Sequence, residues 1–307
     1  MIKDRESKGL KCMISSMALA SELTLGIYLI KTLISLYKIM FLPVVTFNSG
    51  SWNNITVAEM NKLQVVQLKF LKRILHTPSS TANCITFLEL GILPIEFNNI
   101  NINQLGFLHH ILTLEENDPV RQAYNQQKLF VFEKNWYNEV IALRNKYDIT
   151  QTDEEIALLT KEKWKSLVKD AINVYALSFL NLENSQKKKT SHLPMYTELQ
   201  PQQYFEFLSP ADSRLFFSIR SGTLDIKSLR KYNYSDGDTC CRLCGLGDET
   251  IEHIVNECDE LPITVTVEDV YSVERESVET VLSKVKDFIK LSEEREEQAK
   301  TVEPAND

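Results

Sequence analysis

Three cysteines and one histidine are spaced as metal ligands towards the carboxyl-terminal end of the chain. Cys241, Cys244, His253 and Cys258 follow the pattern C-x2-C-x8-H-x4-C and fall within eighteen residues. Structural zinc sites use four sulfur or nitrogen ligands in a tetrahedron, and a C-x2-C turn supplies two thiolates from one bend of the backbone. Gly245 follows the second cysteine and permits that tight bend. The pattern predicts one zinc ion held by these four side chains.

Two alternatives to this zinc site remain open on the sequence alone. Cys240 offers a competing C-x3-C register, although C-x2-C is the commoner zinc turn. The cysteines could also be ordinary thiols beside an unrelated histidine, but four of the chain's six cysteines lie within nineteen residues. Cys12 and Cys84 are isolated and no signal peptide precedes them, so we expect reduced thiols and a cytoplasmic or nuclear protein.

The composition predicts an all-α protein, in which a helical bundle is followed by a small zinc-knuckle subdomain. The 307 residues are 43% hydrophobic and include only nine glycines and nine prolines, which is typical of helices joined by short connections. We expect a helical segment (1–78), a second helical domain (79–186), a linker (187–208), a basic helix with the zinc finger (209–262) and an acidic helical tail (263–307).

The apolar stretch from 23 to 41 is predicted to be a buried helix. Lys31 and Lys38 interrupt it, whereas a membrane-spanning helix needs about 20 mostly apolar residues. Pro43 should end this helix, because proline lacks the backbone N–H that a helix interior uses. We therefore expect no membrane partner.

A basic helix face follows this segment. Thr56 and Glu59 form a capping-box pattern, which predicts a helix running to about His76. Apolar residues from Met60 to Ile74 share one side. The arc opposite them carries the basic residues Lys62, Lys69, Lys72, Arg73 and His76. Such stripes usually face solvent, but the absence of any acidic residue along this arc favours contact with phosphates.

A second group of basic residues leads into the zinc ligands. Ser209 with Pro210 is a typical helix start and Gly222 a typical helix end, so we expect a helix between them. This helix and the loop after it should present a basic surface next to the finger, formed by Arg214, Arg220, Lys227, Arg230 and Lys231.

The net charge of −8 is distributed unevenly. Residues 246–307 contain 18 acidic and 6 basic residues, whereas residues 1–245 contain 24 acidic and 28 basic residues. A mildly basic body joined to an acidic tail indicates a polyanion partner or an acidic interaction segment. We expect the tail to dock through its apolar residues between 278 and 289 and to restrain nucleic-acid binding by the body.

Several short stretches occur in a characteristic order over residues 23–295. They are Phe41-Leu42-Pro43 followed by Trp52, the segment 67–75 with Pro78-Ser79-Ser80-Thr81, the segment 88–95, and Arg214-Leu215-Phe216-Phe217 before the cysteines. In this order the chain resembles the region behind the polymerase core of reverse transcriptases from non-LTR (LINE-type) retrotransposons. That region comprises the thumb, which segment 1–78 resembles, and a cysteine/histidine segment.

The resemblance implies binding of RNA and of a template–primer duplex, with a reverse-transcriptase core supplied in trans. It does not imply catalysis here, since polymerases hold two metal ions with paired aspartates and the sequence has no Asp-Asp pair. We therefore expect a zinc-dependent RNA- or DNA-binding remnant that is not an enzyme. The alternative is a helical protein-interaction scaffold stapled by a structural zinc ion, with the acidic tail as its partner surface.

Overall fold

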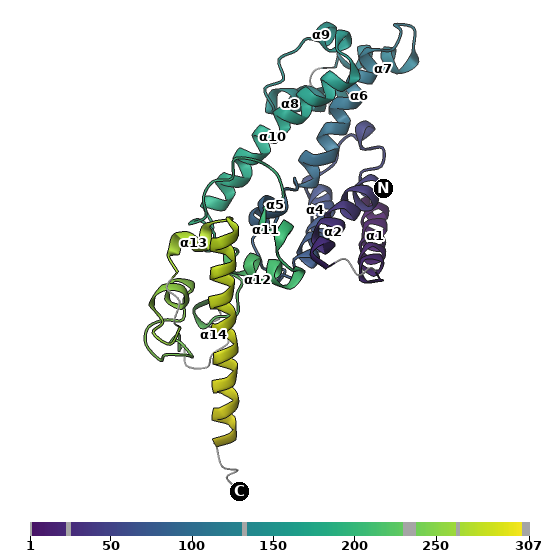
Figure 1. Cartoon of the computed structure of the whole chain (residues 1–307). Coiled ribbons are helices and arrows are strands. Elements are labelled where there is room, and N and C mark those ends of the chain that lie inside the picture. Colours follow the sequence, from purple (N-terminus) through teal and green to yellow (C-terminus); the bar gives the residue numbers. More distant parts are fainter. Residues whose placement is uncertain (1, 23–25, 131–133, 230–237, 262–264, 303–307) are drawn as a thin grey trace.

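The protein is all-α (Figure 1), in a computed structural model that describes residues 2–22, 26–130, 134–229, 238–261 and 265–302. The first helices are α1 (Ile2–Glu22), α2 (Leu29–Leu36), α3 (Leu42–Val45), α4 (Val57–Ile74) and α5 (Asn83–Leu90). The next are α6 (Ile102–Leu112), α7 (Pro119–Gln127), α8 (Trp136–Lys146), α9 (Asp153–Leu158) and α10 (Lys161–Ser185). The last are α11 (Tyr204–Phe207), α12 (Pro210–Arg220), α13 (Val267–Tyr271) and α14 (Arg275–Val302).

Short helical turns join these helices. They are η1 (Gly26–Tyr28), η2 (Tyr37–Phe41), η3 (Ser49–Ser51), η4 (Glu96–Asn101), η5 (Lys227–Leu229) and η7 (His253–Glu257). Within the described residues, the one β feature is an isolated antiparallel bridge between Cys240 and Asp248.

Two hydrophobic cores organise the helices. The larger core is built from α1 to α5, α11 to α14 and the segment that carries the predicted zinc ligands, and the smaller from α6 to α10. Helix α10 packs against both α6 and α5 and so joins the two cores. Figure 1 shows an elongated molecule, with α7, α8 and α9 at one end and the long helix α14 at the other.

The helix starts follow the local sequence signals. The Thr56 hydroxyl accepts a hydrogen bond from the Glu59 N–H at 3.2 Å, and the Glu59 carboxylate accepts one from the Thr56 N–H at 3.1 Å, which confirms the predicted capping box. At the start of α12, the Ser209 hydroxyl accepts a bond from the Asp212 N–H at 3.1 Å. Gly222 follows that helix with a φ of +63°, the left-handed conformation typical of a helix end.

The predicted helix end at Pro43 is wrong, because the helical path continues to Val45. The preceding residues Tyr37–Phe41 form a π-helical turn, and Pro43 lies in the first turn of α3. Proline is tolerated where the preceding backbone has already left the regular hydrogen-bonding pattern. The turn also brings Tyr37 and Phe41 against Phe70 of α4, with ring centroids 5.2 to 5.6 Å apart among the three.

The segment Gly26–Val45 is long and apolar enough to cross a membrane when judged by length and composition, with a hydropathy of 1.6. Its side chains nevertheless contribute to the larger core, where Ile30, Tyr37 and Phe41 are at most 1% exposed. The core helix of a soluble protein has the same composition, and the absence of a membrane partner stays a prediction.

The segment 187–208, which we expected to be a linker, packs into the larger core. The Asn181 side chain donates to the Tyr196 carbonyl oxygen at 2.8 Å and accepts from the Tyr196 N–H at 3.1 Å. The segment also crosses α5 closely at Gly91, where a Cβ would lie 2.1 Å from the Gln200 carbonyl carbon. These contacts hold a segment made mostly of turns against the larger core, so the segment does not separate two independent cores.

The segment 263–307 contains the predicted helix, but α14 is an integral part of the larger core. Salt bridges join it to the body, with Lys286 2.6 Å from Asp212 and Arg295 3.1 Å from Glu260. Deleting residues 263–307 would therefore expose apolar core and could not test electrostatic restraint alone. The buried apolar residues of the helix are Val278, Val281, Leu282, Val285 and Phe288.

Glu89 and Arg220 form an ion pair inside the larger core, and their side chains are 0% and 1% exposed. Arg220 Nε donates to Glu89 Oε1 at 2.9 Å, and the Tyr204 hydroxyl donates to Oε2 at 2.6 Å. The Tyr196 hydroxyl also donates to this carboxylate, and Arg220 donates to the Tyr271 carbonyl oxygen at 2.8 Å. The pair thus connects α5, α12, α13 and the segment before α11.

Replacing Glu89 by leucine is expected to lower the free energy of unfolding by about 3 to 5 kcal/mol, because it leaves a buried guanidinium without its counter-charge. Urea unfolding followed by circular dichroism measures the change. The double variant Glu89→Leu with Arg220→Met should recover part of the loss, since it removes both charges. Glu206→Gln is the control: its solvent-exposed pair with Lys31 should contribute less than about 1 kcal/mol. A Glu89→Leu protein as stable as this control would contradict the prediction.

Candidate metal centre and basic groove

Cys241, Cys244, His253 and Cys258 converge as the spacing predicted. One ligand atom from each residue lies within 4.8 Å of the ligand atoms of the other three, and Cys244 is the one ligand that is partly exposed. Cys241 and Cys244 come from a tight turn. His253 begins η7, and Cys258 directly follows η7. The four side chains can therefore hold a metal ion in the tetrahedral manner of a Cys3His set.

The turn between the first two cysteines is closed by backbone hydrogen bonds. The Gly245 N–H donates to the Cys241 carbonyl oxygen at 2.9 Å, and the Cys241 N–H donates to the Gly247 carbonyl oxygen at 3.0 Å. The Leu246 N–H points to the Cys244 sulfur at 3.3 Å, which stabilises a thiolate there. Gly245 has a φ of +70°, so the left-handed bend predicted after the second cysteine is present.

The His253 ring is oriented by contacts on both of its nitrogens. Nε2 lies 3.2 Å from the Cys244 sulfur, and Nδ1 lies 3.5 Å from the Glu257 carboxylate. A carboxylate beside one ring nitrogen holds the proton there and leaves the other nitrogen free to bind metal. The residue that orients the ligand was not predicted, although its position four residues after the histidine on a helical turn is a usable signal.

The thiols of the cluster are poorly solvated. Burial, together with the neighbouring Cys241 and Cys244 sulfurs, raises the pKa of the Cys258 thiol to about 12. Burial also raises the pKa of Cys241. A divalent cation stabilises the thiolates against this effect, so protons and metal compete for the same sulfur atoms.

Cys240 does not belong to the group of four. Its side chain is exposed, whereas Cys241 is buried. Neighbouring residues of an extended backbone place their side chains on opposite faces, and Cys240 is extended here because it pairs with Asp248 across the turn. The geometry therefore selects the C-x2-C register over the C-x3-C alternative.

A salt bridge between Arg242 and the buried Glu249 supports the turn, and the sequence did not predict it. Glu249 is fully buried, and its carboxylate accepts bonds from the Arg242 N–H at 2.9 Å and from Arg242 Nε at 3.0 Å. It also accepts from the Lys227 N–H at 2.9 Å, which ties η5 to the turn. A spacing of seven residues carries no local signal, because only the closed turn brings the two side chains together.

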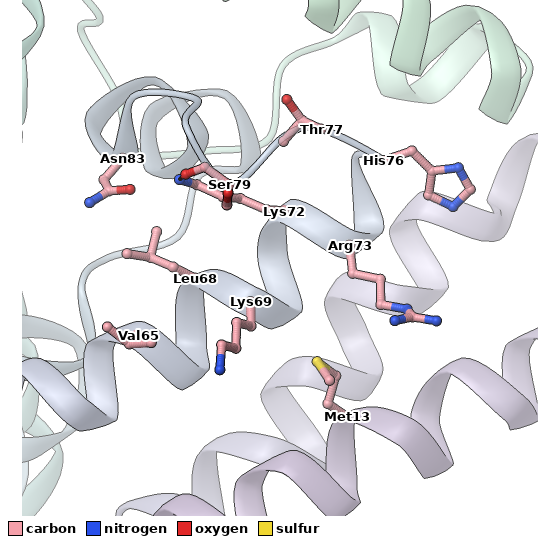
Figure 2. A pocket seen from close by; sticks show the side chains of 10 residues that line it. All are labelled: Met13, Val65, Leu68, Lys69, Lys72, Arg73, His76, Thr77, Ser79 and Asn83. Carbon is pink, nitrogen blue, oxygen red and sulfur yellow. Dashed lines mark hydrogen bonds between the residues drawn. The ribbon is translucent and has the colours of Figure 1, made fainter.

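Four of the five basic residues predicted on α4 are exposed. Lys69, Arg73 and His76 line a cavity of about 750 Å³ between α4, α1 and the turn that leads to α5, and we call this cavity the basic groove (Figure 2). Lys62 lies on the same helix outside its lining. In the part of the chain that the structure describes, neither Lys69 nor Arg73 forms a salt bridge with an acid. Burial, and then the charges of Arg214 and Arg73, lower the pKa of His76.

Lys72, the fifth residue of the predicted face, was expected to face solvent, but it is buried. It is 8% exposed, and its ammonium donates to the carbonyl oxygens of Ser79 at 2.7 Å and Thr81 at 2.6 Å. These carbonyls belong to the turn after α4 and have no helical partner. Lys72 therefore fixes the wall of the basic groove and is unavailable for a phosphate.

The predicted basic surface before the finger is also corrected. Arg220 is buried with Glu89, and the Arg214 guanidinium donates to the Ile74 carbonyl oxygen at 3.1 Å, which caps the end of α4. Lys227 pairs with Asp238 at 2.6 Å. Burial and pairing thus remove the exposed positive charge that we expected from these three residues. The last two predicted residues, Arg230 and Lys231, lie outside the described residues.

No protein-family model, curated protein or solved structure matches this chain. The candidate metal centre and the basic groove are therefore the features that indicate a function.

The four-residue ligand set predicts which cysteine variants lose metal. We expect Cys244→Ser and His253→Ala to abolish stoichiometric binding of one divalent ion per chain, because three ligands of a buried set do not hold the ion tightly. Cys240→Ser should retain it. Elemental analysis of the purified proteins measures the metal content. Loss of metal from Cys240→Ser together with retention in Cys244→Ser would reverse the assignment.

Proposed function

We propose that this protein is a zinc-stabilised nucleic-acid-binding protein, and that its basic groove contacts the phosphates of RNA or DNA. The observation that carries the proposal is the convergence of Lys69, Arg73 and His76 on one cavity of about 750 Å³. Several basic side chains around one hollow focus a positive potential there, which attracts an anionic partner.

Zinc is the metal that best fits the candidate metal centre. Three sulfurs and one imidazole nitrogen form a set that zinc prefers, whereas magnesium and calcium require oxygen ligands. All four positions of a tetrahedron are supplied by protein side chains, and structural zinc sites have this property. We therefore assign the ion a structural role and propose that the protein has no catalytic site of its own.

Charge in the basic groove supports the choice of a phosphate ligand. Among the described residues that line it, none is acidic, and Lys72 and Ser79 shape the wall. The apolar floor is formed by residues such as Met13 and Leu68 (Figure 2). We propose that a nucleic-acid backbone lies along α4, as the resemblance to the thumb of LINE-type reverse transcriptases implies, and that a reverse-transcriptase core is a partner in trans.

A helical protein-interaction scaffold is the second candidate function. It is favoured by exposed apolar side chains on α10, where Val174 is 70% and Leu182 is 62% exposed. Exposed apolar residues grouped on one helix are typical of protein contacts. Under this alternative the zinc ion still stabilises the fold, but the basic groove binds no polyanion.

Nucleic-acid binding should depend on salt through the basic groove. Each phosphate contact releases counterions, so Lys69→Gln with Arg73→Gln should reduce the slope of log affinity against log salt by about 2. Fluorescence anisotropy with single-stranded RNA, single-stranded DNA and duplex DNA at several salt concentrations measures the slope. The matched control is Lys163→Gln with Lys169→Gln, which removes the same charge from exposed positions on α10. Equal slopes for the two double variants would reject the groove, and no binding at all would favour the scaffold.

Binding should also become tighter as pH falls. The pKa of His76 is lowered in the free protein, so its ring is neutral at pH 7, and a bound phosphate favours the protonated ring. Binding therefore takes up a proton, and affinity should increase by up to about tenfold between pH 7.5 and pH 5.5. Anisotropy titrations across this range test the expectation. The same rise in His76→Gln would show that another group is responsible.

A further inference from the structure

A second large cavity lies away from both the basic groove and the candidate metal centre. It has a volume of about 580 Å³ and is enclosed by α6, η3 and the first two turns of α10. Sites for small molecules typically have volumes between about 300 and 1,000 Å³ and combine apolar walls with a few polar groups. The residues that line it include Gly106, Phe107, His109, Trp164, Lys161 and Lys165.

Aromatic rings form part of the wall. Trp164 is 1% exposed, and its indole N–H donates to the Leu105 carbonyl oxygen at 2.8 Å. The His109 ring lies nearly parallel to it, with an interplanar angle of 18° and centroids 6.5 Å apart. Phe107 of α6 also lines the cavity. Because Trp164 is almost completely buried, it supports the wall from behind, and the partly exposed ring of Phe107 is the aromatic surface that a ligand can reach.

Gly106 keeps the cavity open at the middle of α6. A glycine inside a helix lowers stability by about 1 kcal/mol relative to alanine. A Cβ built at this position meets no heavy atom within 4 Å, and the residue is exposed. No packing or backbone constraint therefore explains the glycine, and the space that a side chain would occupy belongs to the cavity.

The polar groups at this cavity favour an anionic ligand. His109 Nε2 lies 2.9 Å from the Leu159 carbonyl oxygen. A carbonyl only accepts, so this ring nitrogen is the donor and its hydrogen bond is made within the protein. Lys161 and Lys165 lie one turn apart at the exposed start of α10 and supply positive charge. Among the described lining residues there is no acidic side chain to oppose them.

We propose that this cavity binds a small planar aromatic anion. The ring would occupy the space beside Gly106 and contact Phe107, and its carboxylate, sulfonate or phosphate would pair with the exposed Lys161 and Lys165. The site is independent of the proposed nucleic-acid function, since none of its lining residues lines the basic groove.

A matched pair of probes tests the proposal. Naphthalene-2-carboxylate and naphthalene-2-methanol share a ring system and differ in charge, and calorimetry or ligand-observed NMR with the full chain measures their dissociation constants. We expect the carboxylate to bind at least fivefold more tightly than the alcohol. Lys161→Gln with Lys165→Gln should abolish that difference, and Lys163→Gln, on the same helix but outside the lining, should leave it unchanged.

Filling the cavity provides the second arm. Gly106→Leu should weaken both probes at least tenfold, while its melting temperature stays the same or rises, because leucine is the better helix former. Unchanged affinity in a folded Gly106→Leu protein would overturn the proposal. Equal binding of the two probes by the wild-type protein would overturn the assignment of an anion. A phosphate-containing oligonucleotide should not compete with either probe, and competition would mean that the cavity belongs to a nucleic-acid surface.

Discussion

The buried pair of Glu89 and Arg220 determines how the larger core is assembled. An uncompensated charge costs several kcal/mol inside a protein, so the two residues have to be buried together. Two tyrosine hydroxyls donate hydrogen bonds to the Glu89 carboxylate. The Arg220 guanidinium also donates to the Tyr271 carbonyl oxygen of α13. Four segments that are distant in sequence therefore share one electrostatic requirement. The pair constrains how these segments are arranged, whereas the apolar residues around it supply most of the stabilisation.

The candidate metal centre is continuous with this core. Leu243, Ile254 and Val255 are buried in the same cluster as α12 and α14, and Lys284 of α14 donates to the Val255 carbonyl oxygen at 2.7 Å. Small zinc modules usually depend on the ion because their own core is too small. Here the helices provide much of that core, and a metal ion held by the four ligands would fix the turn and η7 against them. The buried bridge of Glu249 with Arg242 acts on the same turn from the other side.

The basic groove and the cavity beside α6 offer different chemistry. The basic groove along α4 combines mobile cationic side chains with an apolar floor, and it suits the repeated charges of a polymer. The cavity beside α6 is walled by aromatic rings and takes its positive charge from the exposed Lys161 and Lys165, and it suits a single small molecule. Each cavity depends on one residue that is locally unfavourable, the buried Lys72 in the first and the mid-helical Gly106 in the second.

The sequence by itself determined the helical class, the capping boxes and the four metal-ligand positions. These features depend on residues at most eighteen positions apart, and local backbone geometry relates such residues directly. The sequence did not determine which basic residues remain in solvent. Lys72 and Arg220 have the same local signals as their exposed neighbours, and only the way the turn after α4 folds back and the position of the Glu89 carboxylate bury them. The predicted docking of the tail through apolar residues between 278 and 289 is confirmed by their burial in the larger core. The packing of 187–208 was decided by tertiary contacts, because burial is a property of the partner surface as well as of the segment.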